Sequence, residues 1–171
     1  NEILILEGGY NEEHEVSLKS SIFIKKILKK LKINYKILRV NPTNFEKKIA
    51  KYKNMICFNA LHGPFGEDGK IQKILKKNRI KFTHSGYKSS KICFDKVTTK
   101  KILSKNGILT PEFNVLSIKD LNEKVILKLK EKYNQFVIKP KSSGSSYGTI
   151  IIKNEKDVKD FIKKILNYKK S

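Results

Sequence analysis

Three glutamates stand between an apolar segment and an amphipathic segment near the start of the chain. Glu12, Glu13 and Glu15 follow the apolar run 3–6 and two glycines, in a chain whose formal net charge is +22. Open α/β sheets bind ligands at turns beyond the carboxyl ends of strands, and a carboxylate there suits a ligand with a positively charged amine. For any one glutamate alone, the better explanation is support of the next helix start, where carboxylates interact favourably with the helix dipole.

A second polar loop, His-Gly-Pro-Phe-Gly-Glu-Asp-Gly, occupies residues 62–69 between an apolar strand pattern and a helix pattern. His62 could hydrogen-bond an anionic carboxylate or phosphate, or transfer a proton. We therefore expect a functional role for His62. Glu67 and Asp68 are equally suited to capping the next helix, and both interpretations of these two residues stay open.

A third segment, Lys-Pro-Lys-Ser-Ser-Gly-Ser-Ser-Tyr-Gly-Thr, occupies residues 139–149. Its small residues allow backbone N–H groups to converge on an anion, and Lys139 adds positive charge. The segment lacks the spacing of a P-loop, and a mobile surface turn is an equal alternative. Together with Lys96, which follows Asp95 at a predicted helix start, it could form one wall of a nucleotide site.

The first half of the chain alternates predicted strands and helices. We expect strands at residues 2–7, 35–40, 54–60 and 81–84, and helices at residues 16–31, 44–52 and 70–78. This alternation predicts right-handed βαβ units and a mostly parallel sheet, hence an α/β fold.

The pattern changes near Ser90, where we place a domain boundary. We expect a helix at 96–105 capped by Asp95, a strand at 113–117, a helix at 120–133, strands at 135–139 and 148–152, and a helix at 155–168. The last two strands are joined by one short loop rich in glycine and serine, which predicts an antiparallel hairpin.

The strong positive charge invites a nucleic-acid hypothesis, but its details disfavour one. Of the 38 basic residues only Arg39 and Arg79 are arginine, and arginine is preferred for bidentate recognition of phosphates and bases. The lysines are scattered over every predicted helix. We interpret most of the charge as solvated surface, with no specific nucleic-acid partner.

Cys57 and Cys93 stand far apart, each within an apolar stretch. Two buried thiols in a reducing cytoplasm are favoured over a disulfide or a metal site. The sequence holds no apolar run of membrane-spanning length, so we expect a cytoplasmic protein without membrane partners.

Five motifs, taken in order, resemble the D-alanine–D-alanine ligases of the ATP-grasp superfamily. They are GGYNEEHEVSLKS (8–20), ALHGPFGEDGKIQ (60–72), FTHSGYKSSKICFDKVTTK (82–100), NGILTP (106–111) and VIKPKSSGSSYG (137–148). The resemblance implies a Rossmann-like parallel-sheet domain over residues 1–90, followed by the first ATP-grasp α+β subdomain over residues 91–171. It also implies a ligase that uses ATP to join two D-alanines through an acyl phosphate, for peptidoglycan synthesis.

The resemblance also implies roles for individual residues near the first substrate. Glu13 matches the glutamate that anchors the ammonium of the first D-alanine. His62 matches a histidine near the carboxylate of that substrate and near the developing acyl phosphate. Ser145 matches a serine linked to this glutamate and to the closing loop.

Further positions match the part of the family that holds ATP. Lys96 and Lys139 match two lysines that face the ATP phosphates. Ser145 also belongs to the phosphate flap, with Ser146, Tyr147 and Gly148. Phosphoryl transfer depends on positioning and charge neutralisation, so cations and N–H donors at these positions fit the implied chemistry.

Other parts of the implied ligase are expected downstream of this chain. They include the carboxylates that bind Mg²⁺ (or Mn²⁺), an arginine and the far wall of the adenine pocket. We therefore expect this chain to be a fragment with no metal site of its own and no turnover alone. The resemblance also implies a homodimer built through the first domain.

Two other interpretations remain. Another ATP-grasp ligase could use D-serine or D-lactate as the second substrate, since that pocket is expected to lie largely downstream. A noncatalytic remnant that binds a nucleotide or a polyanion is the second alternative, although it leaves the ordered motifs unexplained.

Overall fold

A computed structural model describes residues 2–144, 146 and 148–170, which divide into two compact units. The first unit holds residues 2–102 and 142–144, and the second holds residues 103–141, 146 and 148–170. The division falls inside helix α5 (Lys96–Lys105). The domain boundary near Ser90 stays a prediction.

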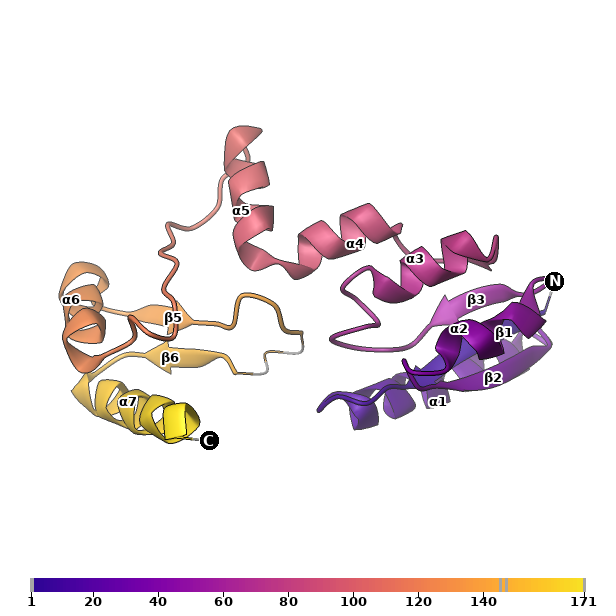
Figure 1. Cartoon of the computed structure of the whole chain (residues 1–171), viewed down its shortest axis with the longest axis horizontal. Helices are drawn as coiled ribbons and strands as arrows, with labels where there is room; N and C mark the ends of the chain where they lie inside the picture. Colours follow the sequence, from indigo (N-terminus) through magenta and orange to yellow (C-terminus); the bar gives the residue numbers. More distant parts are fainter. Residues whose placement is uncertain (1, 145, 147, 171) are drawn as a thin grey trace. The chain divides into compact units, whose positions relative to one another are not determined.

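The first unit is built on a four-stranded parallel sheet, which confirms the predicted α/β class. Its strands are β1 (Ile3–Gly8), β2 (Tyr35–Val40), β3 (Ile56–Asn59) and β4 (Lys81–Phe82), in the order β2-β1-β3-β4. Figure 1 labels the first three of these strands. Because all four strands run in parallel, their carboxyl ends lie at one edge of the sheet. The loops that follow β1, β3 and β4 therefore emerge at that edge.

Helices cover both faces of this sheet. They are α1 (His14–Lys30), α2 (Phe45–Ile49), the short 3-10 helix η1 (Ala50–Tyr52) and α3 (Lys70–Lys77), and α4 (Tyr87–Phe94) follows β4 and contacts α3. Alternate side chains of β1 point to opposite faces, so Leu4 and Leu6 share a core with α2 and α3, while Ile5 packs with Leu28 of α1. Burial of each such side chain contributes about 1.5–3 kcal/mol, which makes β1 the centre of the fold.

A buried carboxylate ties α1 to β1. Glu7 accepts hydrogen bonds from the Ser21 hydroxyl and from Lys25 Nζ at 3.1 Å, and Arg39 Nε lies 3.5 Å from its other oxygen. Burial alone would raise the pKa of Glu7, but the hydrogen bond from Ser21 and the nearby cations hold that pKa below its ordinary value. This contact fixes the helix that follows the first polar loop.

Helix α4 was not predicted from the sequence. None of its residues is buried, so it lacks the apolar periodicity on which such a prediction depends. The next helix, α5, begins as predicted, because the carboxylate of Asp95 accepts the N–H of Thr98 at 2.9 Å.

The second unit packs two helices on a two-stranded hairpin. Its elements are α6 (Glu123–Tyr133), β5 (Phe136–Ile138), β6 (Ile150–Ile152) and α7 (Glu155–Lys170). The strands pair antiparallel, as predicted. Ile126 of α6, Ile152 of β6 and Val158 and Phe161 of α7 form the buried centre of this unit.

Two expectations for the second half of the chain are wrong. Residues 113–117 do not form a strand; in the part of the chain that the structure describes, β5 and β6 pair only with one another, so this backbone has no strand partner there. Helix α6 begins at Glu123, not at Asp120, because the side chain of Asn122 accepts the N–H of Val125 at 3.0 Å.

The two cysteines differ in environment. Cys57 is buried and Cys93 is exposed, and both are free thiols. The expectation of two buried thiols is therefore wrong for Cys93, which lies on α4, a helix without buried residues. Over the described residues, no helix combines the length and apolar character needed to cross a membrane.

Candidate functional site

The loop between β1 and α1 buries one of its three glutamates. Glu12 and Glu15 are exposed, whereas Glu13 is only 3% exposed. Neither carboxylate oxygen of Glu13 has a hydrogen-bond partner among the described residues. A buried carboxylate without a partner is costly, so this position is unlike an ordinary helix start.

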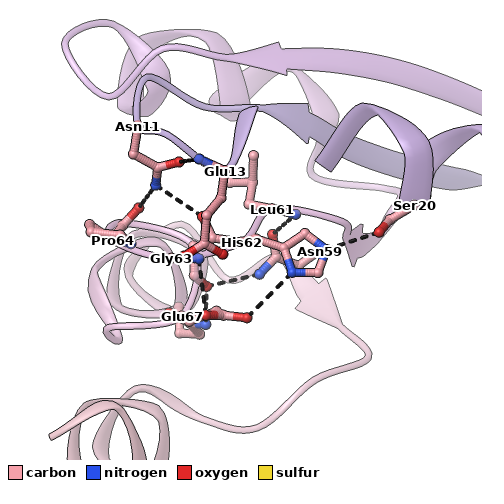
Figure 2. Close-up of polar contacts among 11 residues, drawn as sticks. Asn11, Glu13, Ser20, Asn59, Leu61, His62, Gly63, Pro64 and Glu67 are labelled. Carbon is pink, nitrogen blue, oxygen red and sulfur yellow. Dashed lines mark hydrogen bonds and ion pairs between the residues drawn. The ribbon is translucent and has the colours of Figure 1, made fainter. Parts of the chain in front are cut away.

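Asn11 joins the first polar loop to the second (Figure 2). Its side-chain oxygen accepts the N–H of Glu13 at 3.0 Å, while its amide nitrogen donates to the carbonyls of His62 at 3.0 Å and Pro64 at 3.2 Å. These bonds use both ends of one side chain, so Asn11 fixes Glu13 beside the loop that follows β3.

Two glycines border the carboxylate of Glu13. A Cβ atom on Gly63 would lie 3.0 Å from Oε1 of Glu13, and a Cβ atom on Gly144 would lie 3.1 Å from the same oxygen. Gly63 also has a φ of +70°, which side-chain-bearing residues rarely adopt. The carboxylate therefore faces bare backbone on both sides, where side chains would crowd it.

His62 is held between a hydroxyl and a carboxylate. Its Nε2 lies 2.9 Å from the Ser20 hydroxyl oxygen, and its Nδ1 lies 3.7 Å from Oε1 of Glu67 (Figure 2). The other oxygen of Glu67 accepts the N–H of Gly63 at 3.0 Å. Because Glu67 contacts both His62 and the glycine beside Glu13, it sets the geometry of the whole loop.

Glu67 and Asp68 therefore have different roles. Asp68 accepts the N–H of Lys70 at 3.0 Å, at the first residue of α3, and so supports that helix start. Glu67 points instead toward His62. The question that the sequence left open is thus answered separately for each carboxylate.

A cavity of about 670 Å³ lies within the first unit, at the edge where β3 and β4 end. His62 and Glu67 line it together with Lys96 and Ser143. Lys96 Nζ donates to the carbonyl of Ser143 at 2.7 Å. Of the predicted ATP-binding residues, Lys96 is thus placed at the same cavity as His62.

Three other predicted ATP-binding residues, Lys139, Ser146 and Gly148, belong to the second unit. Lys139 follows β5 directly. Gly148 has a φ of +69°, and a Cβ atom on Gly148 would lie 2.7 Å from Cγ of Pro140. Ser146 is exposed and also has a positive φ, of 60°. Ser145 and Tyr147 lie outside the described residues.

Sequence reasoning missed three side chains at this site: Asn11, Ser20 and His84. Burial lowers the pKa of His84, whose two ring nitrogens have no hydrogen-bond partner in the part of the chain that the structure covers. His84 follows β4 closely at the ligand-binding edge, so the strand-end rule that singled out the first two loops could have found it. Asn11 and Ser20 carry no comparable signal.

The residues at this site do not fit a magnesium ion. Within residues 2–144, 146 and 148–170, no group of three histidine, cysteine, aspartate or glutamate side chains is arranged to hold a metal. Magnesium prefers near-octahedral oxygen ligands, and Glu13 and Glu67 are placed against glycine backbone and His62 instead. Metal ligands elsewhere in a longer protein stay a prediction.

Comparison with known proteins identifies what this arrangement resembles. A D-alanine–D-alanine ligase from Pelagibacter ubique is 44% identical over 168 residues, which cover 93% of this chain and 54% of that protein. A D-alanine–D-alanine ligase structure from Bacillus anthracis matches with a TM-score of 0.73 at 31% identity, covering 98% of this chain and 54% of that one. The ATP complex of a Bacillus anthracis ligase matches with the same TM-score at 28% identity, covering 98% of this chain and 53% of that one.

No protein-family model matches the chain. The chain spans about half the length of the curated relatives it matches, such as the ligase from Pelagibacter ubique. The resemblance predicted from the five motifs is nevertheless confirmed: this chain is related in sequence and in fold to the D-alanine–D-alanine ligases, over about half of their length.

Proposed function

We propose that this chain forms the part of an ATP-dependent D-alanine–D-alanine ligase that binds the first D-alanine. The observation that carries the proposal is the carboxylate of Glu13, which is 3% exposed and has no partner for either oxygen among the described residues. A buried carboxylate is stabilised by a cation that also donates hydrogen bonds. The ammonium group of an amino acid supplies both.

Gly63 and Gly144 support this assignment through the space they leave. Each lacks a side chain where a Cβ atom would lie about 3 Å from the Glu13 carboxylate. A small ammonium group can approach a carboxylate bordered by backbone more closely than one bordered by side chains. Glu13 is therefore assigned as the ammonium anchor.

His62 is assigned to the carboxylate end of the same substrate. Glu67 Oε1 lies 3.7 Å from Nδ1 and orients the imidazole ring from that side. The opposite nitrogen, near Ser20, is then the one that can exchange its partner for the substrate. A positioned imidazole stabilises negative charge that develops as the carboxylate accepts a phosphoryl group.

ATP fits this proposal as the phosphoryl donor. A ligase structure related to this chain is a complex with ATP. The family resemblance assigns Lys96 and Lys139 to neutralisation of the ATP phosphates, and assigns Ser146 and Gly148 to the phosphate flap, and we keep these roles in the proposal. ATP would supply a phosphoryl group to the substrate carboxylate, giving an acyl phosphate and ADP. The amine of a second D-alanine would then attack the acyl carbon, which forms the peptide bond and releases inorganic phosphate. Ser145 and Tyr147 keep their predicted roles as part of the proposal.

Three broader expectations belong to the same proposal. A ligase that consumes ATP and supplies peptidoglycan precursors is expected in the cytoplasm. Homodimer formation through the first unit stays a prediction. We expect no specific nucleic-acid partner, because the 38 basic residues are almost all lysine.

The test is a kinetic assay of ADP release in a protein that carries this chain together with the remaining half of a ligase. Glu13→Gln should raise the KM for the first D-alanine at least about tenfold, as expected for a lost charged hydrogen bond, and leave the KM for ATP nearly unchanged. The control is Glu12→Gln, an equal change at an exposed neighbour, which should alter neither constant. An equal rise in both constants for Glu13→Gln would contradict the assignment. The 171-residue chain alone should release no ADP.

A further inference from the structure

A second histidine, His84, lies at the ligand-binding edge of the sheet. His84 comes two residues after β4, as His62 comes three residues after the neighbouring strand β3. Both side chains line the cavity of about 670 Å³. The His84 ring packs on Phe82, with ring centroids 4.8 Å apart and a 39° angle between the planes. Its position is thus fixed from one side by the last residue of β4.

The two nitrogens of the His84 ring are buried and make no hydrogen bond to any described residue. A neutral imidazole always presents one donor and one acceptor. A core position of this size is better filled by an aromatic ring without polar atoms, since burying polar groups without partners is destabilising. A histidine with both nitrogens unpaired beside a cavity is therefore expected to serve something that enters the cavity.

The lining of the cavity favours an anion. Ser85, Ser89, Ser90 and Lys96 line it. Ser90 Oγ donates to the Ser85 carbonyl at 3.3 Å and Lys96 Nζ donates to the Ser143 carbonyl at 2.7 Å, and a lysine ammonium group carries more than one N–H donor. Glu67 is the one carboxylate among the described residues that line it, and its oxygens already face His62 and the Gly63 N–H. Hydrogen-bond donors thus outnumber carboxylates around His84.

We propose that His84 is a hydrogen-bond donor to an anionic group, a carboxylate or a phosphate, bound in this cavity between the ends of β3 and β4. The inference rests on the proposed function, in which a carboxylate and a phosphoryl group meet at this edge of the sheet. It adds a ligand-contacting residue from the loop after β4, which the motif-based assignments did not include. The shared chemistry is a negatively charged oxygen that accepts the N–H of the His84 ring.

The experiment follows the three histidine rings of the whole chain by NMR during titration with inorganic phosphate, and separately with acetate. The His84 signals, assigned from their loss in His84→Phe, should shift and saturate with at least one of these anions. Titrations with D-alanine and with ADP then show whether substrate carboxylate or nucleotide phosphate is the source. His84 signals that stay unchanged with all four ligands would overturn the proposal.

His84→Phe tests the same proposal through affinity. It keeps an aromatic ring against Phe82 and removes both unpaired nitrogens, so the variant should be as stable as the parent chain or more stable. Anion binding should weaken by about 10- to 100-fold, the range expected for a lost charged hydrogen bond. A variant with unchanged affinity would show that His84 only fills space.

His14→Gln is the matched control, because the ring of His14 contacts the Gly9 carbonyl and does not line the cavity. His14→Gln should bind phosphate as tightly as the parent chain does. Nonspecific binding of phosphate to surface lysines would be the same in His14→Gln and in His84→Phe, so it cannot produce a difference between them. Glu13→Gln separates this inference from the proposed function. If the ammonium anchor is wrong but His84 is right, Glu13→Gln leaves D-alanine binding unchanged while His84→Phe still weakens phosphate binding.

Discussion

Replacing Glu7 with glutamine removes the buried negative charge that holds α1 against β1. Glu7 is only 3% exposed, and its carboxylate accepts from Ser21 and from Lys25, whose side chain is 24% exposed. The side chain of Arg39 is 79% exposed, so its contribution is screened by solvent. In Glu7→Gln, Ser21 can still donate to the amide oxygen, and Lys25 can turn toward water.

The expected loss follows from these contacts. Breaking a fully buried ion pair costs about 3–5 kcal/mol, and a hydrogen bond to a charged group contributes about 1.5–3 kcal/mol. Because Lys25 is partly exposed and the hydrogen bond from Ser21 survives, the expected loss is that of a hydrogen bond to a charged group, which is the smaller of these two free energies. We expect the free energy of unfolding of the first unit to fall by about 2 kcal/mol at pH 7.

The assay is urea unfolding, followed by amide hydrogen exchange in peptides from β1 and β3, so that the second unit does not contribute. Glu2→Gln is the matched control, because it changes the net charge equally. The side chains of the Glu2–Lys36 pair are 47% and 59% exposed at 3.6 Å, so this variant should lose less than about 0.5 kcal/mol.

The dependence on pH provides a second check. The pKa of Glu7 is lower in the folded chain than its ordinary value. The charge of Glu7 therefore stabilises the fold fully at pH values above the ordinary pKa of a glutamate. This stabilisation is lost as the pH falls through the folded pKa. The difference between the parent chain and Glu7→Gln should therefore disappear in acid. Equal losses for Glu7→Gln and Glu2→Gln at pH 7 would refute the reasoning.

Two further predictions concern a glycine and the cysteines. Gly63→Ala should destabilise the first unit by about 1–2 kcal/mol, because Gly63 has a φ of +70° and a Cβ atom there would lie 3.0 Å from Glu13. Gly86→Ala is the control, since a Cβ atom on Gly86 would enter open space, and it should change the urea midpoint little. Equal shifts of the urea midpoint in the two variants would contradict this prediction. Burial raises the pKa of the Cys57 thiol to about 12. Brief treatment of the folded chain with iodoacetamide at pH 8 should therefore modify Cys93 and leave Cys57 unmodified, as measured by mass spectrometry. Modification of Cys57 without Cys93 would contradict the fold.

The strands and most helices of the first unit could be predicted because their apolar periodicity records which side chains are buried. Leu4 and Ile5 belong to opposite faces of one strand, and both are fully buried. Helix α4 buries none of its residues, so the same signal was absent. The expected strand at 113–117 failed for a related reason, since a strand also needs a partner backbone that local sequence does not specify.

The candidate site was predictable at the residues that follow strands and carry charge. His62 was singled out in this way, whereas the strand-end rule indicated only the loop with Glu12, Glu13 and Glu15, and the family resemblance was needed to choose Glu13. In the structure Glu13 is the buried member of the three. Ser20 of α1 contacts His62, which lies 42 positions later in the chain, and Asn11 contacts the same residue across 51 positions. Such contacts depend on the fold and leave no local pattern.

The most direct test of the central claim is a comparison of D-alanine with D-lactate as ligands of this chain, measured by NMR. D-lactate has the same carboxylate and methyl group but no ammonium group. If the buried carboxylate of Glu13 anchors an ammonium group, D-alanine should bind at least about tenfold more tightly than D-lactate. That preference should vanish in Glu13→Gln and persist in Glu12→Gln. Equal binding of the two ligands by the parent chain, or an unchanged preference in Glu13→Gln, would contradict the account.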